Sequence, residues 1–246
     1  MKKLNRVLIT IITLITIILL YEWLAIRFNN QLIWPRINLI WHYYKKLNQL
    51  HLWLTIYETL MRTLMSYGLA VLFGLMISIL SIGLKINPII NKFVSLLRTL
   101  PTIAIIILIL VWFKSETAPF IISFLVVFPL LYEGFYHGII NVDQKLREVC
   151  QVYRFSGWKR IKYLYFYQMI EQFFLNVKQS FGLAFKIMVM AEVIGQVKKG
   201  IGYEINQARM NIEMEGIIIW TLILIILVLI MESLLNQISK MVLKWK

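Results

Sequence analysis

The sequence contains few of the residues from which enzymes build reactive sites. It has a single cysteine, Cys150, so no disulfide can form within the chain. Its three histidines lie far apart in the sequence, at His42, His51 and His137. There is no glycine-rich phosphate-binding loop and no run of histidine and cysteine at metal-ligand spacing. These absences exclude ATP hydrolysis by this chain alone, and we expect it to hold neither a metal nor a cofactor.

Charged residues are also scarce, at 15% of the 246 residues, whereas 60% of the chain is hydrophobic. A soluble domain is roughly 45–50% apolar, and each bilayer crossing needs about 20 mostly apolar residues. Six apolar stretches approach or exceed this length, at about 7–26, 60–82, 96–113, 118–138, 179–197 and 216–238. The composition therefore predicts an all-α, polytopic membrane protein with about six transmembrane helices.

The third stretch is the least regular of the six. Arg98 and Pro101 lie near its start, and the purely apolar part that follows is short. We predict a crossing helix over 96–113 and keep a re-entrant segment as the alternative, since membrane helices tolerate proline where their neighbours satisfy the freed carbonyl. The chain then divides into residues 1–59, a first transmembrane helix with an outside loop, and residues 60–246, a core of five transmembrane helices.

Basic residues outnumber acidic ones by 26 to 12, a formal net charge of +14. This excess of positive charge could indicate binding to nucleic acid, but basic residues also gather on the cytoplasmic flanks of membrane helices. With six crossings, most lysines and arginines fall on the side of the N-terminus, which predicts that both termini are cytoplasmic and that no nucleic acid is bound. The first apolar stretch is too long for a signal peptide and lacks a small-residue cleavage site, so we expect a retained helix.

The long inside segment, about residues 139–178, has an organised pattern. Between 143 and 164 apolar residues recur every three positions among charged ones, which predicts a helix with one apolar stripe. Ser156-Gly157 interrupts the pattern and indicates a turn between two short helices. Such an amphipathic pair on the inside face is suited to dock a partner protein.

Two charges lie inside the fifth apolar stretch, Lys186 and Glu192. A charged side chain at a helix centre costs about 2.5–3.5 kcal/mol on insertion scales, so each needs a partner, a cavity or a function. Six residues apart, the two lie on largely opposite faces of one helix and are not expected to pair with each other. Glu192 is expected to face another helix or a wet cavity, in either a functional or a structural role, and Lys186 either has a function or extends its stem toward the cytoplasmic interface.

Several ordered blocks carry a resemblance to a known family. Glu148-Val149-Cys150, Arg154 and Tyr167 stand where that family's cytoplasmic signature has Glu-Ala-Ala, Gly and Pro. Closer agreement comes from Arg98-Thr99-Leu100-Pro101, Val111-Trp112-Phe113, Ala191-Glu192-Val193-Ile194-Gly195, Gly200-Ile201-Gly202-Tyr203 and Gln207-Ala208-Arg209. Over about residues 55–246 the chain resembles the inner-membrane permeases of binding-protein-dependent ABC importers, especially the subgroup for nitrate, sulfonate, taurine and thiamine precursors.

The resemblance implies a homodimeric permease that receives a small polar solute from an extracytoplasmic binding protein. Two copies of a separate ATPase subunit, which binds the ATP and Mg, would drive it. The residues implied in ATPase coupling are Glu148, Val149, Cys150, Arg154, Phe155, Ser156, Gly157 and Trp158. Those implied along the translocation pathway or in the helix-bundle interior are Arg98, Pro101 and Glu192.

Two rival functions belong to other classes. An ion-coupled secondary transporter would need convergent carboxylates within the membrane, for which Glu192 alone is thin support. A membrane enzyme would need a catalytic constellation that the sequence lacks. The sequence leaves open which solute is carried, whether a sulfonate, nitrate or a vitamin precursor, and whether the permease pairs with itself or with a second kind of chain.

Overall fold

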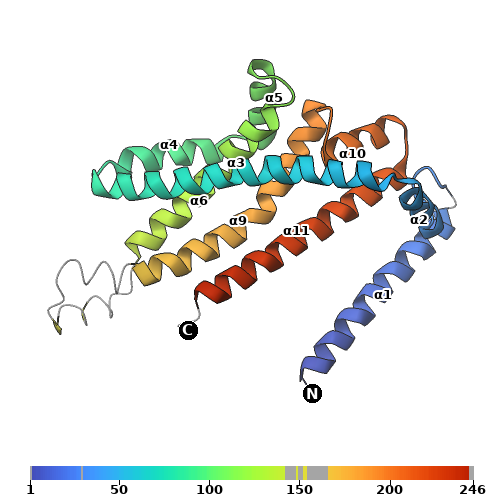
Figure 1. Cartoon of the computed structure of the whole chain (residues 1–246), viewed down its shortest axis with the longest axis horizontal. Coiled ribbons are helices and arrows are strands. Elements are labelled where there is room, and N and C mark those ends of the chain that lie inside the picture. Colours follow the sequence, from blue (N-terminus) through green and yellow to red (C-terminus); the bar gives the residue numbers. More distant parts are fainter. Residues whose placement is uncertain (1, 29, 142–147, 149–151, 154–165, 244–246) are drawn as a thin grey trace.

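The computed structural model describes the whole chain except residues 1, 29, 142–147, 149–151, 154–165 and 244–246 (Figure 1). Every regular element in the described part is an α-helix, so the all-α prediction is confirmed. In chain order these helices are α1 (Lys2–Phe28), α2 (Ile37–Lys46), α3 (Gln49–Gly83), α4 (Asn87–Thr99), α5 (Thr102–Trp112), α6 (Ala118–Ile140), α9 (Phe166–Gly195), α10 (Ile201–Met210) and α11 (Met214–Val242).

Helix α3 is longer than the sequence pattern predicted. It begins after Asn48, whose side-chain oxygen accepts a hydrogen bond from the backbone N–H of Leu50 at 2.9 Å and so caps the first turn. The apolar stretch expected at about 60–82 lies inside this helix, which begins well before it. Helix α2 and the first turns of α3 occupy much of the expected outside loop, and the predicted boundary between 59 and 60 falls inside α3.

The third predicted span is broken. Helices α4 and α5 are separated at Leu100 and Pro101 and bent by 94°, which makes the pair a broken span or a re-entrant loop. Pro101 supplies no N–H to continue α4 and holds the preceding residue, Leu100, in an extended conformation with φ −69° and ψ 130°. The prediction of one continuous helix over 96–113 was thus wrong.

The core forms where α6 packs between α3 and α9. Tyr67 of α3 is buried there, and its hydroxyl donates a hydrogen bond to the carbonyl of Val177 at 2.6 Å. The same ring meets Phe181 edge-on at 5.1 Å between centroids. About two turns further along α3, Gly74 lies so close to α6 that an added Cβ would be 3.2 Å from the side chain of Leu131. These contacts hold the three helices as one packed unit.

Three of the described helices, α3, α6 and α11, are each long and apolar enough to cross a bilayer, and the bent pair α4–α5 adds a fourth span if counted as one. The predicted stretches 7–26 and 179–197 lie in helices α1 and α9. The total of about six crossings stays a prediction. Figure 1 shows α1 extending away from the other helices, while α11 runs antiparallel to α9 along the side of the bundle.

Candidate functional site

The most distinctive polar feature of the bundle is the buried carboxylate of Glu192, near the end of α9. Among the described residues it is the one charged side chain with no exposed surface. Thr59 of α3 donates its hydroxyl to the two carboxylate oxygens, at 3.0 and 3.2 Å. Arg62, one turn further along α3, forms an ion pair with the same carboxylate. A third donor is the backbone N–H of Gly202, 3.0 Å from Oε2.

The glycines of the Gly200-Ile201-Gly202 segment make this arrangement possible. Gly200 has φ +118°, a conformation that side chains rarely permit, and it turns the chain into α10. A Cβ on Gly202 would lie 2.3 Å from the Cβ of Glu192 and 2.8 Å from the carbonyl oxygen of Val189, so only glycine allows this approach of α10 to α9. The first turn of α10 therefore presents the backbone N–H of Gly202 to the carboxylate.

Glu192 thus serves as a cap for α10, supplied from a neighbouring helix. The first N–H groups of a helix lack intrahelical partners and carry a partial positive charge, which favours an anion beside them. The cap has a second member, because the backbone N–H of Ile201 donates to the hydroxyl oxygen of Thr59 at 2.8 Å. Two side chains, from α9 and α3, therefore satisfy the start of α10.

Arg62 links this cluster to the loops around it. Its NH1 also donates to the carbonyl of Lys199 at 3.4 Å, and its NH2 lies 3.5 Å from Oε2 of Glu116, in the loop between α5 and α6. Oε1 of Glu116 in turn accepts a hydrogen bond from the backbone N–H of Lys198 at 2.8 Å. The network joins α3, α9, the start of α10 and the α5–α6 loop. We call Glu192, Arg62, Thr59 and Glu116 the carboxylate network.

The chemistry of the carboxylate network favours positioning over catalysis. Hydrogen-bond donors from the chain itself occupy both oxygens of Glu192. Among the described residues no group of three or more histidine, cysteine, aspartate or glutamate side chains could hold a metal ion. A hollow of about 660 Å³ lies beside Arg62, lined also by Glu116 and Phe120, so the outer side of the network borders open space.

The other predicted interior residues lie elsewhere. Arg98, in the last turn of α4, is exposed on the surface of the chain and forms an ion pair with Glu133 of α6. Pro101, at the bend before α5, is also exposed. The structure therefore does not bring Arg98 or Pro101 together with Glu192.

Most of the predicted ATPase-coupling residues lie outside the described residues. The exception is Glu148, which is exposed. The other predicted coupling residues are not among those that the structure describes: Val149, Cys150, Arg154, Phe155, Ser156, Gly157 and Trp158. Their role in coupling stays a prediction.

Sequence reasoning missed the partners of Glu192. Arg62 lies 130 residues away in the chain and Thr59 lies 133 away, so no local pattern connects them to the carboxylate. One feature of the sequence could have indicated Arg62. It is a charge near the start of an apolar stretch, so burying it in the membrane is costly, as it is for Glu192. Two opposite charges in different membrane helices are candidates for a pair on that ground alone.

Comparison with known proteins covers most of the chain. Residues 70–244 match the model of the family described as binding-protein-dependent transport system inner membrane component. A Bacillus subtilis (strain 168) protein named as an aliphatic sulfonates transport permease protein, SsuC, is 28% identical over 80% of this chain and 70% of its own length. The taurine transport system permease protein TauC of Escherichia coli (strain K12) is 22% identical over 79% of this chain and 71% of its own.

Solved structures show the same fold. A chain of the MetNI methionine ABC transporter in an inward-facing conformation aligns with a TM-score of 0.63, at 14% identity, over 80% of this chain and 99% of its own. A chain of an amino acid ABC transporter solved with histidines aligns with a TM-score of 0.65, at 19% identity, over 76% and 91%. Since the family match spans well over half of the sequence, this chain belongs to the inner membrane components of binding-protein-dependent transport systems and is a transport permease, not an enzyme.

Proposed function

We propose that this permease passes a small sulfonate-type solute across the cytoplasmic membrane from an extracytoplasmic binding protein. The proposal rests on the similarity of this chain to proteins that are named as permeases for aliphatic sulfonates and for taurine. Nitrate and vitamin precursors, the other solutes that the sequence left open, are the alternatives to be tested. An ion-coupled secondary transporter is not favoured, because the family match is to components of importers that work with a binding protein.

In the proposed assembly two copies of this chain form the pathway and two copies of an ATPase subunit, which bind ATP and Mg, dock on the cytoplasmic side. Both termini are cytoplasmic. The docking surface comprises the predicted coupling residues around Glu148, Phe155 and Trp158. Arg98 and Pro101, both exposed on the isolated chain, then face the pathway between the two copies.

The fold supports a way in which ATPase movement would reach the pathway. Helix α6 ends at Ile140 and α9 begins at Phe166, so both lead directly from the predicted docking segment into the core. Because α6 packs against both α3 and α9, displacement of the docking segment would move the three helices as a rigid unit. At the opposite end of α9 the carboxylate network fixes α10 to this unit.

The test is uptake by proteoliposomes that contain this permease, its ATPase and its binding protein. Labelled ethanesulfonate and taurine should accumulate when ATP is supplied on the ATPase side, and the permease alone should neither hydrolyse ATP nor concentrate solute. Accumulation of nitrate or of a pyrimidine in place of the sulfonates would replace the proposed solute. Uptake by the permease alone, driven by an ion gradient, would overturn the proposal altogether.

A further inference from the structure

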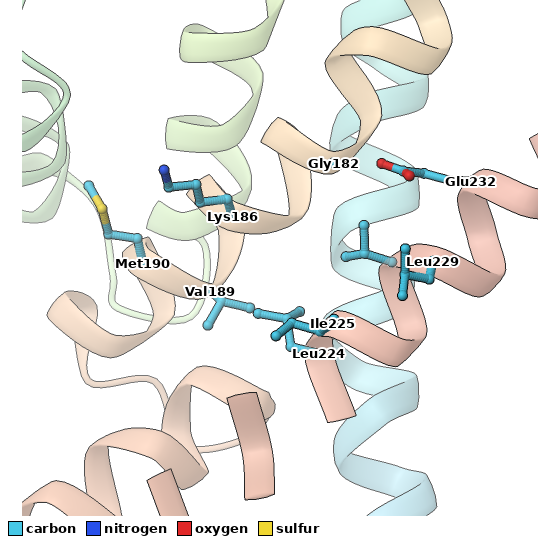
Figure 2. Close-up of a pocket in the computed structure, with 9 residues that line it drawn as sticks. Gly182, Lys186, Val189, Met190, Leu224, Ile225, Leu229 and Glu232 are labelled. Atoms are coloured by element: carbon cyan, nitrogen blue, oxygen red, sulfur yellow. The ribbon is translucent and has the colours of Figure 1, made fainter. Parts of the chain in front are cut away.

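A groove between α9 and α11 carries two opposite charges in an otherwise apolar wall (Figure 2). Its volume is about 500 Å³. Lys186 of α9 and Glu232 of α11 are the charged residues that line it. The apolar side chains of its wall are Val189, Met190, Leu224, Ile225, Val228 and Leu229.

The antiparallel course of the two helices brings these charges into one groove. Gly182 faces α11, and a Cβ there would lie 2.9 Å from Oε1 of Glu232, so the missing side chain makes room for the carboxylate. Lys186 follows Gly182 by four residues and shares its helix face, about 6 Å further along the axis. Figure 2 shows the lysine ammonium directed away from the carboxylate, so the two charges stand apart.

Neither charge takes part in the ion pairs found in the described part of the chain, which involve Arg62, Arg98 and His51 with other carboxylates. Lys186 is exposed although its neighbours Phe185 and Ile187 are buried. It lies well inside α9 and not in a terminal turn, and α11 is one of the helices apolar enough to cross the membrane. Charges facing lipid there would be costly, whereas charged residues within membrane spans commonly mark a substrate pathway.

We propose that this groove binds the transported solute during passage, as a small anion on a short aliphatic chain. Lys186 binds the anionic group of the solute, and the apolar wall of α11 packs against the aliphatic chain of the solute. Glu232 discriminates between solutes by the substituent at the end away from the anionic group. A carboxylate there attracts an amino group and repels a second negative charge. The inference rests on the proposed function and deepens it, because it favours amino-substituted sulfonates over simple alkanesulfonates.

The experiment compares uptake of taurine and ethanesulfonate, which differ in the terminal amino group. The complete transporter is reconstituted in phosphatidylcholine vesicles, with saturating amounts of solute-loaded binding protein. Lys186→Met should lower uptake of both solutes by about ten- to hundredfold, the loss expected for a hydrogen bond to a charged group. Lys186→Arg should retain most uptake. Lys178→Met, which removes the same charge from the same helix outside the groove, is the matched control and should transport normally.

Glu232→Gln supplies the second and sharper readout. It should reduce taurine uptake but leave ethanesulfonate uptake unchanged or raised, so the ratio of the two rates should shift by about tenfold. A purely structural role for Glu232 would lower both rates together. An unchanged ratio with Glu232→Gln, or wild-type uptake with Lys186→Met, would overturn the inference while the proposed function stands.

Two further arms separate other outcomes. An anionic lipid head group on its acyl chain has the same chemistry as an alkanesulfonate, so the series is repeated with phosphatidylglycerol in the vesicles. If Lys186→Met impairs uptake only there, the groove holds lipid and the inference fails. If the wild-type transporter takes up neither sulfonate, the proposed function itself has failed.

Discussion

The ion pair between Glu192 and Arg62 allows a quantitative test of the carboxylate network. Glu192→Gln keeps the size of the side chain but places an amide NH₂ where Thr59, Gly202 or Arg62 now donates. Arg62, whose side chain is 13% exposed, would keep only its longer contacts to the carbonyl of Lys199 and to the partly exposed Glu116. Breaking a buried ion pair by removing one partner costs about 3–5 kcal/mol. We expect Glu192→Gln and Arg62→Gln each to lose that much free energy of unfolding.

The measurement is denaturant unfolding of the detergent-solubilised permease, followed by a double-mutant cycle. In the Arg62→Gln/Glu192→Gln variant neither charge is left unpaired, so its loss should be smaller than the sum of the single losses by about 2 kcal/mol or more. Glu116→Gln is the control, since its side chain is 45% exposed and the loss should stay below about 1 kcal/mol. Single losses under about 0.5 kcal/mol, or strict additivity, would refute the network as described.

Three other predictions concern single positions. Gly202→Ala should destabilise the protein by about 1–3 kcal/mol because its Cβ would overlap Glu192, whereas Gly68→Ala, which meets no atom within 4 Å, should cost nothing in the same unfolding assay. Trp158→Ala should release the ATPase from the solubilised complex, as truncation of an aromatic anchor often costs about 2 kcal/mol or more, and retention would remove Trp158 from the docking site. Arg98→Gln should lose less than about 1 kcal/mol because both members of its ion pair are partly exposed, so a large loss of uptake at normal stability would support a pathway role, and equal losses would contradict it.

The sequence predicted the helical elements well and their ends poorly. Apolar stretches located the interiors of α3, α6, α9 and α11 because a run of apolar residues is a property of the sequence itself. The start of α3 lies about three helical turns before the apolar stretch, since Asn48 lies among mixed polar and apolar residues where hydropathy gives no boundary. Pro101 was noted as an irregularity, but whether a proline ends a membrane helix depends on which neighbours satisfy its carbonyls, and that is decided by packing.

The candidate site could likewise be predicted from the sequence only in part. The carboxylate of Glu192 could be selected from the sequence because a charge in an apolar stretch is costly wherever the helix lies. Its partners could not, since Thr59, Arg62 and Gly202 meet it only once α3, α9 and α10 are packed. Even the requirement for glycine at position 202 becomes intelligible only when α10 is placed against α9.

Lys186 and Glu192 appear alike in the sequence, as two charges six residues apart in one apolar stretch, and their surroundings separate them. A hydroxyl, a backbone N–H and a guanidinium group all donate to Glu192, so the cost of burying its charge is offset. Its position is explained by the stability that it gives to the helix ends it joins. Lys186 faces a groove shared with Glu232, outside the ion pairs of the described bundle. The stability of the folded chain therefore explains why Glu192 is charged. The charge of Lys186 has no such explanation within the single chain, so it is attributed to the assembly or to the solute. Substitution should divide them in the same way, with Glu192→Gln lowering the free energy of unfolding and Lys186→Met lowering uptake from a stably folded protein.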